Sequence, residues 1–157
     1  MKIGILSDSH DNLPKIEQAV KFFKRQKIGF LLHAGDFVAP FAVLKLRALK
    51  CDWRGVFGNN DGEKNGLTRI SKGRIRKGPL KIRLAGRKII LAHDINSIHP
   101  KEEKADLLVY GHSHKPEVKK LNAKLLVNPG ECGGWLSGRS SVAIVDLARL
   151  SAKIFQI

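Results

Sequence analysis

Residues 2–12 read KIGILSDSHDN, an unbroken apolar run that stops at a cluster of polar side chains. The run 2–6 predicts a buried β-strand, and the cluster 7–12 predicts the loop after it. A helix should follow, because Asn12 suits an N-cap and Pro14 suits the first turn. Apolar side chains then recur at helical spacing, at Ile16, Ala19, Val20 and Phe23.

This unit of strand, polar loop and helix repeats, with strand 28–33, loop 34–36, a helix near 38–49 and a strand at 53–57. Strands that alternate with helices need crossover connections and form a parallel sheet. Beyond residue 65 the pattern changes to short strand-like segments at hairpin spacing. These segments are 80–84, 88–92, 107–110, 117–121, 124–127, 141–146 and 152–157. A helix-compatible stretch lies among them at 100–104. The sequence predicts an α/β fold in which two mixed β-sheets pack as a sandwich with flanking helices.

Length and composition favour one globular unit. The chain has 157 residues, 43% of them hydrophobic, and a chain of this length buries roughly two thirds of its unfolded surface. We therefore expect a single domain over residues 1–157 without a cap domain. No apolar run approaches the roughly 20 residues of a membrane span, and the start lacks a signal peptide, which predicts a cytoplasmic protein without a membrane partner. Cys51 and Cys132 form no CxxC pair, which predicts two reduced thiols.

The charge balance is strongly basic, with 29 Lys and Arg against 14 Asp and Glu, a formal net charge of +15. Ten of these cations fall in the stretch 64–88, which contains no acidic residue. Such a run suits either a docking face for nucleic acid or a phosphorylated ligand, or a solvated face that keeps the protein in solution. The stretch has no aromatic side chain for base stacking, so a nucleic-acid role would rest on charge alone.

Five polar clusters each follow an apolar strand and contain atoms that can bind a metal: Asp8-Ser9-His10, Gly35-Asp36, Gly58-Asn59-Asn60-Asp61, His93 and Gly111-His112-Ser113-His114. Ligand sites collect at the carboxyl ends of strands in open α/β sheets, because several loops meet there. Mixed imidazole and carboxylate ligands without thiolate suit Mn²⁺, Fe²⁺, Ni²⁺ or Zn²⁺. Seven ligands are more than one such ion takes, so two ions that share a carboxylate fit better, and Asp36 is the natural bridge.

The order and spacing of these clusters resemble the calcineurin-like metallophosphoesterase superfamily. More narrowly, the opening at 8–12, the stretch 111–116 and Asn128-Pro129-Gly130 are similar to the small YfcE- and MJ0936-like phosphodiesterases, and the resemblance runs from residue 1 to the C-terminal strands. It implies the four-layer metallophosphoesterase fold and hydrolysis of a phosphodiester by a dinuclear centre. A metal-bridging hydroxide would be the nucleophile, and no covalent intermediate would form.

The resemblance also implies the site residues. One ion would be held by Asp8, His10, Asp36 and His114, and the second by Asp36, Asn59, His93 and His112. The ions would be divalent transition metals, Mn²⁺ before Ni²⁺, Fe²⁺ or Zn²⁺. The catalytic residues would be Asn60, His10 and Asp36.

Three positions depart from the family pattern. Asn60 stands where larger members have a histidine that protonates the leaving group, and an amide cannot act as a general acid at neutral pH. Asp94 replaces the usual Gly, where its carboxylate would either fix His93 or repel an anionic substrate. Glu131 replaces the usual Ser and is interpreted as a rim residue, with a metal contact as the alternative.

Other polar and aromatic residues receive a simpler interpretation. His33 is expected to be a buried hydrogen-bonding residue beneath the site, and Trp53 is expected to pack in the core. Trp135 either packs in its loop or lines the substrate edge, and His99 has no assigned role.

The functional hypothesis is a metallophosphoesterase that hydrolyses phosphodiesters, with a nucleotide or nucleic acid as a compatible substrate. The alternatives are a non-catalytic metal-binding scaffold, since a fold alone does not prove activity, and a nucleic-acid-binding protein on the same fold. Association into a homo-oligomer is left open.

Overall fold

A computed structural model describes residues 1–157, and its first half forms a mostly parallel sheet. The strands β1 (Lys2–Leu6), β2 (Phe30–His33), β3 (Asp52–Val56) and β4 (Ile75–Arg76) pair in parallel. The C-terminal hairpin of β10 (Ser141–Asp146) and β11 (Ser151–Gln156) adds antiparallel to β1. The first sheet thus has six strands, in the order β11-β10-β1-β2-β3-β4.

The second sheet has five strands in the order β5-β6-β7-β9-β8 and is also mixed. Hairpins join β5 to β6 and β8 to β9, whereas β6, β7 and β9 are parallel. The bounds are β5 (Leu80–Leu84), β6 (Arg87–Leu91), β7 (Leu107–Val109), β8 (Glu117–Leu121) and β9 (Lys124–Asn128). The predicted fold class, two mixed sheets with flanking helices, is confirmed.

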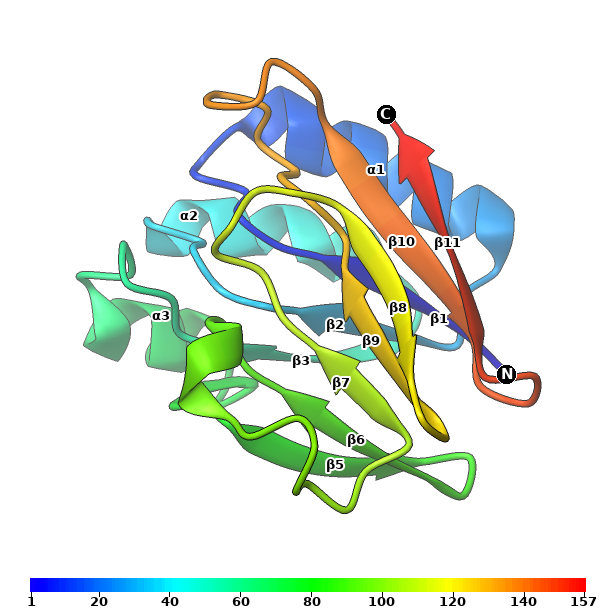
Figure 1. Ribbon diagram of the computed structural model, residues 1–157. Coiled ribbons are helices and arrows are strands. Elements are labelled where there is room, and N and C mark those ends of the chain that lie inside the picture. Colours follow the sequence, from blue (N-terminus) through cyan, green and yellow to red (C-terminus); the bar gives the residue numbers. More distant parts are fainter.

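The two sheets pack face to face because their strands alternate apolar side chains between two faces. In β1, Ile3 and Ile5 lie in the core between the sheets, together with Leu107 and Val109 of β7. The opposite face of the first sheet is covered by helices α1 (Leu13–Gln26) and α2 (Pro40–Val43), as Figure 1 shows. The outer face of the second sheet is covered more thinly, by the 3-10 helix η2 (Ile95–Ser97) and the adjoining loop.

Helix α1 begins as the sequence predicts, with the Asn12 side chain accepting a hydrogen bond from the Lys15 N–H at 3.3 Å. The helix expected near 38–49 is shorter: it consists of α2 and a 3-10 helix, η1 (Leu44–Ala48). Its first residues are held outside the helix, since Val38 and Ala39 donate their N–H groups to the carboxylates of Asp61 and Asp11. Val38 also has a φ of 73°, which no right-handed helix allows.

Three local elements differ from the sequence prediction. Helix α3 (Lys64–Ile70) and the two-residue strand β4 were not predicted. The stretch 100–104 is not a helix: the N–H groups of Glu102 and Glu103 close one turn on the carbonyl of His99, and the chain then enters β7. A single turn gains too few hydrogen bonds to propagate. None of the helices has the length and apolar character that a membrane crossing needs.

The basic stretch 64–88 is divided between the two sheets, because it runs from α3 through β4 of the first sheet into β5 and β6 of the second. Three of its cations are paired with carboxylates from other parts of the chain. Arg74 lies 3.0 Å from Asp52, Lys81 lies 3.3 Å from Glu103, and Arg87 lies 3.4 Å from Asp106. The cations are contiguous in sequence but are distributed over separate elements of the fold.

The core between the sheets gives a stability prediction. Leu107 is fully buried there, so Leu107→Ala should lower the free energy of unfolding by about 2–5 kcal/mol, through lost burial and a cavity. Val118, on the exposed strand β8, is the control, and Val118→Ala should cost less than about 1 kcal/mol. Urea denaturation in the presence of a chelator measures both. Equal losses would show that the sheet interface does not dominate stability.

Candidate metal centre

Five strand ends meet at one edge of the sandwich. Asp8 follows β1, Asp36 follows β2 and Asn59 follows β3, while His93 and the pair His112 and His114 follow β6 and β7 of the second sheet. Parallel strands of both sheets therefore deliver their loops to a common place. A network of short contacts joins all seven side chains that the sequence resemblance selects, and it divides into two groups.

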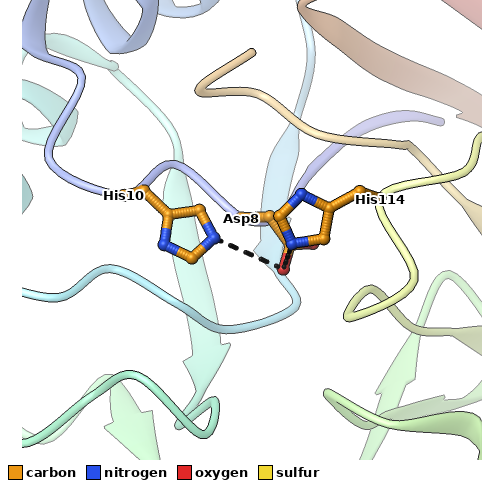
Figure 2. Close-up of side chains that lie close together, drawn as sticks. All are labelled: Asp8, His10 and His114. Carbon is orange, nitrogen blue, oxygen red and sulfur yellow. Dashed lines mark ion pairs between the residues drawn. The ribbon is translucent and has the colours of Figure 1, made fainter. Parts of the chain in front are cut away.

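The first group consists of Asp8, His10 and His114. In Figure 2 the two imidazole rings both face the Asp8 carboxylate. His114 Nε2 lies 3.5 Å from Asp8 Oδ1, and His10 Nε2 lies 4.0 Å from the same oxygen. The two rings are stacked with their centroids 5.3 Å apart. These three side chains come from two distant loops, those after β1 and β7, and have ligand atoms close enough to hold one ion.

The second group is centred on the side-chain oxygen of Asn59. That oxygen lies 2.8 Å from His93 Nε2 and 2.9 Å from His112 Nδ1. The other ring nitrogen of His93, Nδ1, is 2.8 Å from the carbonyl of Ala34; when the single proton of a neutral ring is donated there, Nε2 can bind an ion in place of its contact with Asn59.

Asp36 lies between the two groups. Its Oδ2 atom is 3.6 Å from His10 Nε2 and 3.5 Å from His93 Nε2, so one oxygen faces an imidazole of each group. Asn60 contacts the same carboxylate: its Nδ2 donates to Oδ2 and its backbone N–H donates to Oδ1, both at 2.8 Å. The side chain expected to face the substrate phosphate therefore lies directly on the carboxylate that joins the two groups.

The donor atoms fit divalent cations. Asp8 Oδ1 and His10 Nε2 are buried and have no hydrogen-bond partner in the protein, although both face the same space. Burial raises the pKa of Asp8, and Asp36 is almost fully buried beside it. Buried carboxylates without a compensating cation are costly. A metal ion would satisfy the unpaired atoms and neutralise the charge.

The backbone at this edge is strained. Five of the seven selected residues have a positive φ between 40° and 65°, namely Asp8, His10, Asp36, His112 and His114. Side chains other than glycine rarely adopt this left-handed region, and such residues persist only where the surroundings hold them. Clustering of this strain at strand ends is typical of functional sites.

Asp61 holds part of this strained backbone in place. Its Oδ2 accepts the N–H groups of Gly58 and Asp36 at 2.7 and 3.1 Å, and its Oδ1 accepts that of Val38 at 2.7 Å. Burial raises the pKa of Asp61 in spite of these bonds. The Asp61 carboxylate thus holds the loops after β2 and β3 by hydrogen bonds and does not serve as a metal ligand. Gly58 is required beside it, because a Cβ there would overlap the Asp36 carboxylate.

His33 lies beneath the site, as predicted. Its Nδ1 accepts the N–H of Gly35 at 3.2 Å, so the proton is on Nε2, which faces the Ser9 hydroxyl at 3.1 Å. Ser9 in turn donates to the Asp36 carbonyl at 3.3 Å. Burial, and then the neighbouring His93 and His10, hold the pKa of His33 well below its usual value. A neutral imidazole therefore links the loops that bear Asp8 and Asp36. Trp53 is likewise buried in the core, as predicted.

Glu131 is not a rim residue, because its exposed fraction is 0%. One carboxylate oxygen lies 3.4 Å from His114 Nδ1, on the far side of the ring from Asp8. The carboxylate also accepts the N–H groups of Leu136 and Ser137 at 3.0 and 2.8 Å. Glu131 thus lies within ion-pair distance of His114 and anchors the following loop, a role that its place in the sequence did not show.

Asp94 does not fix His93, which was one of the two expectations for it. Its Oδ1 accepts the N–H of Asn96 at 2.9 Å and caps η2, while both nitrogens of His93 have other partners. Asn128, which the sequence reasoning used only as part of a family motif and gave no role, is fully buried and donates to the Gly111 carbonyl at 2.9 Å and to Ser113 Oγ at 3.0 Å. It holds the loop that carries His112 and His114. A buried Asn directly after an apolar strand was the available signal.

The two groups open onto a cleft of about 520 Å³. Side chains of the site form part of its wall, and the remainder comes from the loops after His114 and Glu131; the lining includes Asp36, Asn59, Asn60, His112, His114, Lys115, Leu136 and Ser137. The arrangement thus combines two clusters of metal-binding atoms, a shared carboxylate, an amide donor and an open approach.

The fold and this site define a class of protein. Residues 1–149 match the family model of the calcineurin-like phosphoesterase superfamily domain, and the chain belongs to that superfamily. The phosphodiesterase MJ0936 of Methanocaldococcus jannaschii is 32% identical over 154 residues, which cover 93% of each chain. The predicted enzyme class, a metallophosphoesterase, is confirmed.

Solved structures agree with this assignment. An archaeal phosphodiesterase superposes with a TM-score of 0.92 and 30% identity over the whole of both chains. The phosphoesterase YfcE of E. coli has a TM-score of 0.71 at 22% identity, with 100% of this chain and 98% of that chain covered, and shares the fold. Members of this superfamily use divalent metal ions, which the donor atoms described above fit.

The hydrogen bonds to Glu131 predict a pH dependence of stability. They outweigh burial and lower its pKa from 4.5 to about 2. A carboxyl whose pKa is lower in the folded than in the unfolded state stabilises the fold above its unfolded pKa, and this stabilisation is lost as pH falls. Between pH 5 and pH 3 the metal-free wild type should lose about 2 kcal/mol that Glu131→Gln does not lose. Urea denaturation at each pH measures this. Parallel pH profiles would contradict the assignment.

Proposed function

We propose that the chain is a phosphodiesterase with a dinuclear metal centre at this edge of the sandwich. The observation that carries the proposal is the position of Asp36. One of its carboxylate oxygens, Oδ2, faces both His10 and His93. One ion would be held by Asp8, His10, Asp36 and His114, and the other by Asp36, Asn59, His93 and His112. Mn²⁺ is the proposed ion before Ni²⁺, Fe²⁺ or Zn²⁺, because the ligands are imidazole and carboxylate.

Two ions in these positions would supply an activated bridging hydroxide for in-line attack and positive charge for the phosphate oxygens. The protein's own groups orient the reaction. Asp36, His10 and Asn60 are the proposed catalytic residues, since they meet where the phosphate would lie. Asn60 Nδ2 can turn from Asp36 to donate to a phosphate oxygen but has no proton to release at neutral pH. The leaving group would take its proton from water, which favours esters with acidic alcohols.

An open cleft favours diesters. Within the 157 residues no further domain covers the site, and the cleft wall is formed by loops of the same fold. We propose that residues 1–157 act as one domain without a cap and accept a substrate with an organic group on each side of the phosphate. We also propose a cytoplasmic location; the two cysteines are unpaired, which suits a reducing compartment.

Asp36 gives a direct test of the dinuclear centre. Asp36→Ala should abolish hydrolysis of bis(p-nitrophenyl) phosphate and lower the bound Mn²⁺ from two ions to one or none, because one side chain contacts both groups. Asp52→Asn is the matched control, since that carboxylate lies at the start of β3, at the opposite end of the strand from Asn59. Turnover after chelation and separate return of Mn²⁺, Ni²⁺, Mg²⁺ and Zn²⁺ is compared with turnover of p-nitrophenyl phosphate. Wild-type activity in Asp36→Ala, or a wild type inactive with every metal, would refute the proposal and favour a non-catalytic scaffold.

Glu131 gives a second test, with a readout other than activity. Its carboxylate orients His114 through Nδ1, and loss of such a partner typically weakens metal affinity 10–100-fold. Glu131→Gln should show that weakening when Mn²⁺ binding is followed by calorimetry. Glu103→Gln, which removes an exposed ion pair with Lys81, is the control and should bind Mn²⁺ like the wild type. Unchanged affinity in Glu131→Gln would show that the Glu131 carboxylate does not position His114 for the metal.

A further inference from the structure

The loop after Glu131 exposes two large apolar side chains beside the metal centre. Trp135 is 66% exposed and Leu136 is 80% exposed, the highest values among the large hydrophobic residues of the chain. Contiguous exposed apolar side chains beside a site commonly mark the surface where a ligand or partner binds. The question is what covers this pair.

The loop is held firmly rather than left free. Glu131 accepts the N–H groups of Leu136 and Ser137, and Asn12 donates to the carbonyl of Gly133 at 2.7 Å. The backbone of Gly133 itself donates to the carbonyl of Asp8 at 2.9 Å, and a Cβ at this glycine would crowd that backbone. The loop is therefore fixed to the segment that carries Asp8 and His10.

Trp135 is fixed within this loop by its ring nitrogen. The indole Nε1–H donates to the backbone carbonyl of His10 at 3.1 Å. Such a bond lies in the plane of the ring and leaves the faces of the ring free of it. Leu136 and Ser137, the next two residues, line the cleft together with Asp36, Asn60 and His114. Trp135 directly precedes these two lining residues, and its indole lies against the backbone of His10 in the first metal-binding group, so the indole stands beside the cleft and is not part of its wall.

We propose that Trp135 and Leu136 form a binding platform for a nucleobase, so that the substrate is a phosphodiester that carries such a base. This inference rests on the proposed function and names its substrate class. A base on the indole would bury the exposed apolar surface by stacking, while its phosphate reaches the centre. Lys115 lines the same cleft and adds positive charge for an anionic ligand. A phosphodiester with a planar base matches both the aromatic rim and the cationic wall.

The test compares two diesters that share one leaving group. Thymidine 5′-(p-nitrophenyl phosphate) carries a base, and methyl p-nitrophenyl phosphate does not. Trp135→Ala should lower kcat/KM for the thymidine diester by about 5- to 100-fold, mainly through KM, and should change the methyl diester less than about twofold. Trp135→Phe keeps a ring and should retain most of the preference, whereas Trp135→Leu keeps only apolar surface and should lose it. Phe41→Ala, which removes an exposed aromatic ring from α2, is the matched control and should leave the preference unchanged.

Three outcomes would overturn the platform. Equal losses on both diesters would assign Trp135 a structural role in the loop. Unchanged kinetics in Trp135→Ala would show that the base lies elsewhere. A wild-type dimer that Trp135→Ala converts to a monomer, seen by size exclusion with light scattering, would make a second copy of the chain the occupant of the rim.

A binding titration that does not depend on turnover distinguishes failure of the base platform from failure of the proposed phosphodiesterase. Trp53 is buried, so the exposed Trp135 is the indole that a ligand can reach. Titration with the dinucleoside phosphate thymidylyl-(3′→5′)-thymidine should quench the Trp135 emission, with Trp135→Phe as the blank. Quenching in a protein inactive towards both diesters keeps the base platform and refutes the phosphodiesterase. Absence of quenching refutes the platform, whatever the activity.

Discussion

Buried negative charge is the constraint on which this edge of the molecule depends. Asp8, Asp36 and Asp61 are each almost fully buried where five strands end, and the only cationic side chains paired with them are histidines. Asp61 is satisfied by three backbone N–H groups, so its charge is spread over the loops that it holds. Asp36 accepts two hydrogen bonds, both from Asn60, and Asp8 accepts the N–H of His112 but retains an oxygen without a partner. Divalent cations would remove this cost, and the buried negative charge that favours their binding would also set their position.

The strain in the loops has the same origin. Left-handed backbone at Asp36, His112 and His114 turns each side chain towards its neighbours as soon as a strand has ended. That geometry costs free energy, and buried polar groups supply the compensation. Asn128 holds the loop of His112 and His114, and Asp61 and His33 hold the loop of Asp36. The sandwich core is rigid and apolar, so the strain is confined to the edge, where ligands are bound.

Sequence reasoning recovered the parts of the molecule that short-range patterns encode. The alternation of strand and helix predicts the parallel sheet from β1 to β3, and motifs directly after apolar runs predict which side chains meet. Contacts between distant segments are not encoded in this way. Glu131 approaches His114 across 17 residues, and the Val38 backbone is drawn out of its helix by Asp61, so neither result could be predicted from local spacing. The expectation that Asp94 fixes His93 fails for the opposite reason: the carboxylate accepts a hydrogen bond from the adjacent turn, at Asn96, instead of from His93.

The basic charge and the aromatic rim act at different distances. Several cations of the stretch 64–88 are paired with Asp52, Glu103 or Asp106 and lie on two separate sheets, so they do not define one docking face. A net charge of +15 still attracts anions over roughly a Debye length and raises their rate of encounter with any part of the surface. Such a field cannot distinguish one phosphate ester from another. Discrimination requires contact, and beside the metal centre the exposed apolar contact surface is Trp135 and Leu136. In the proposed function, long-range charge would bring an anionic substrate to the surface, and the fixed loop after Glu131 would decide which substrate stays.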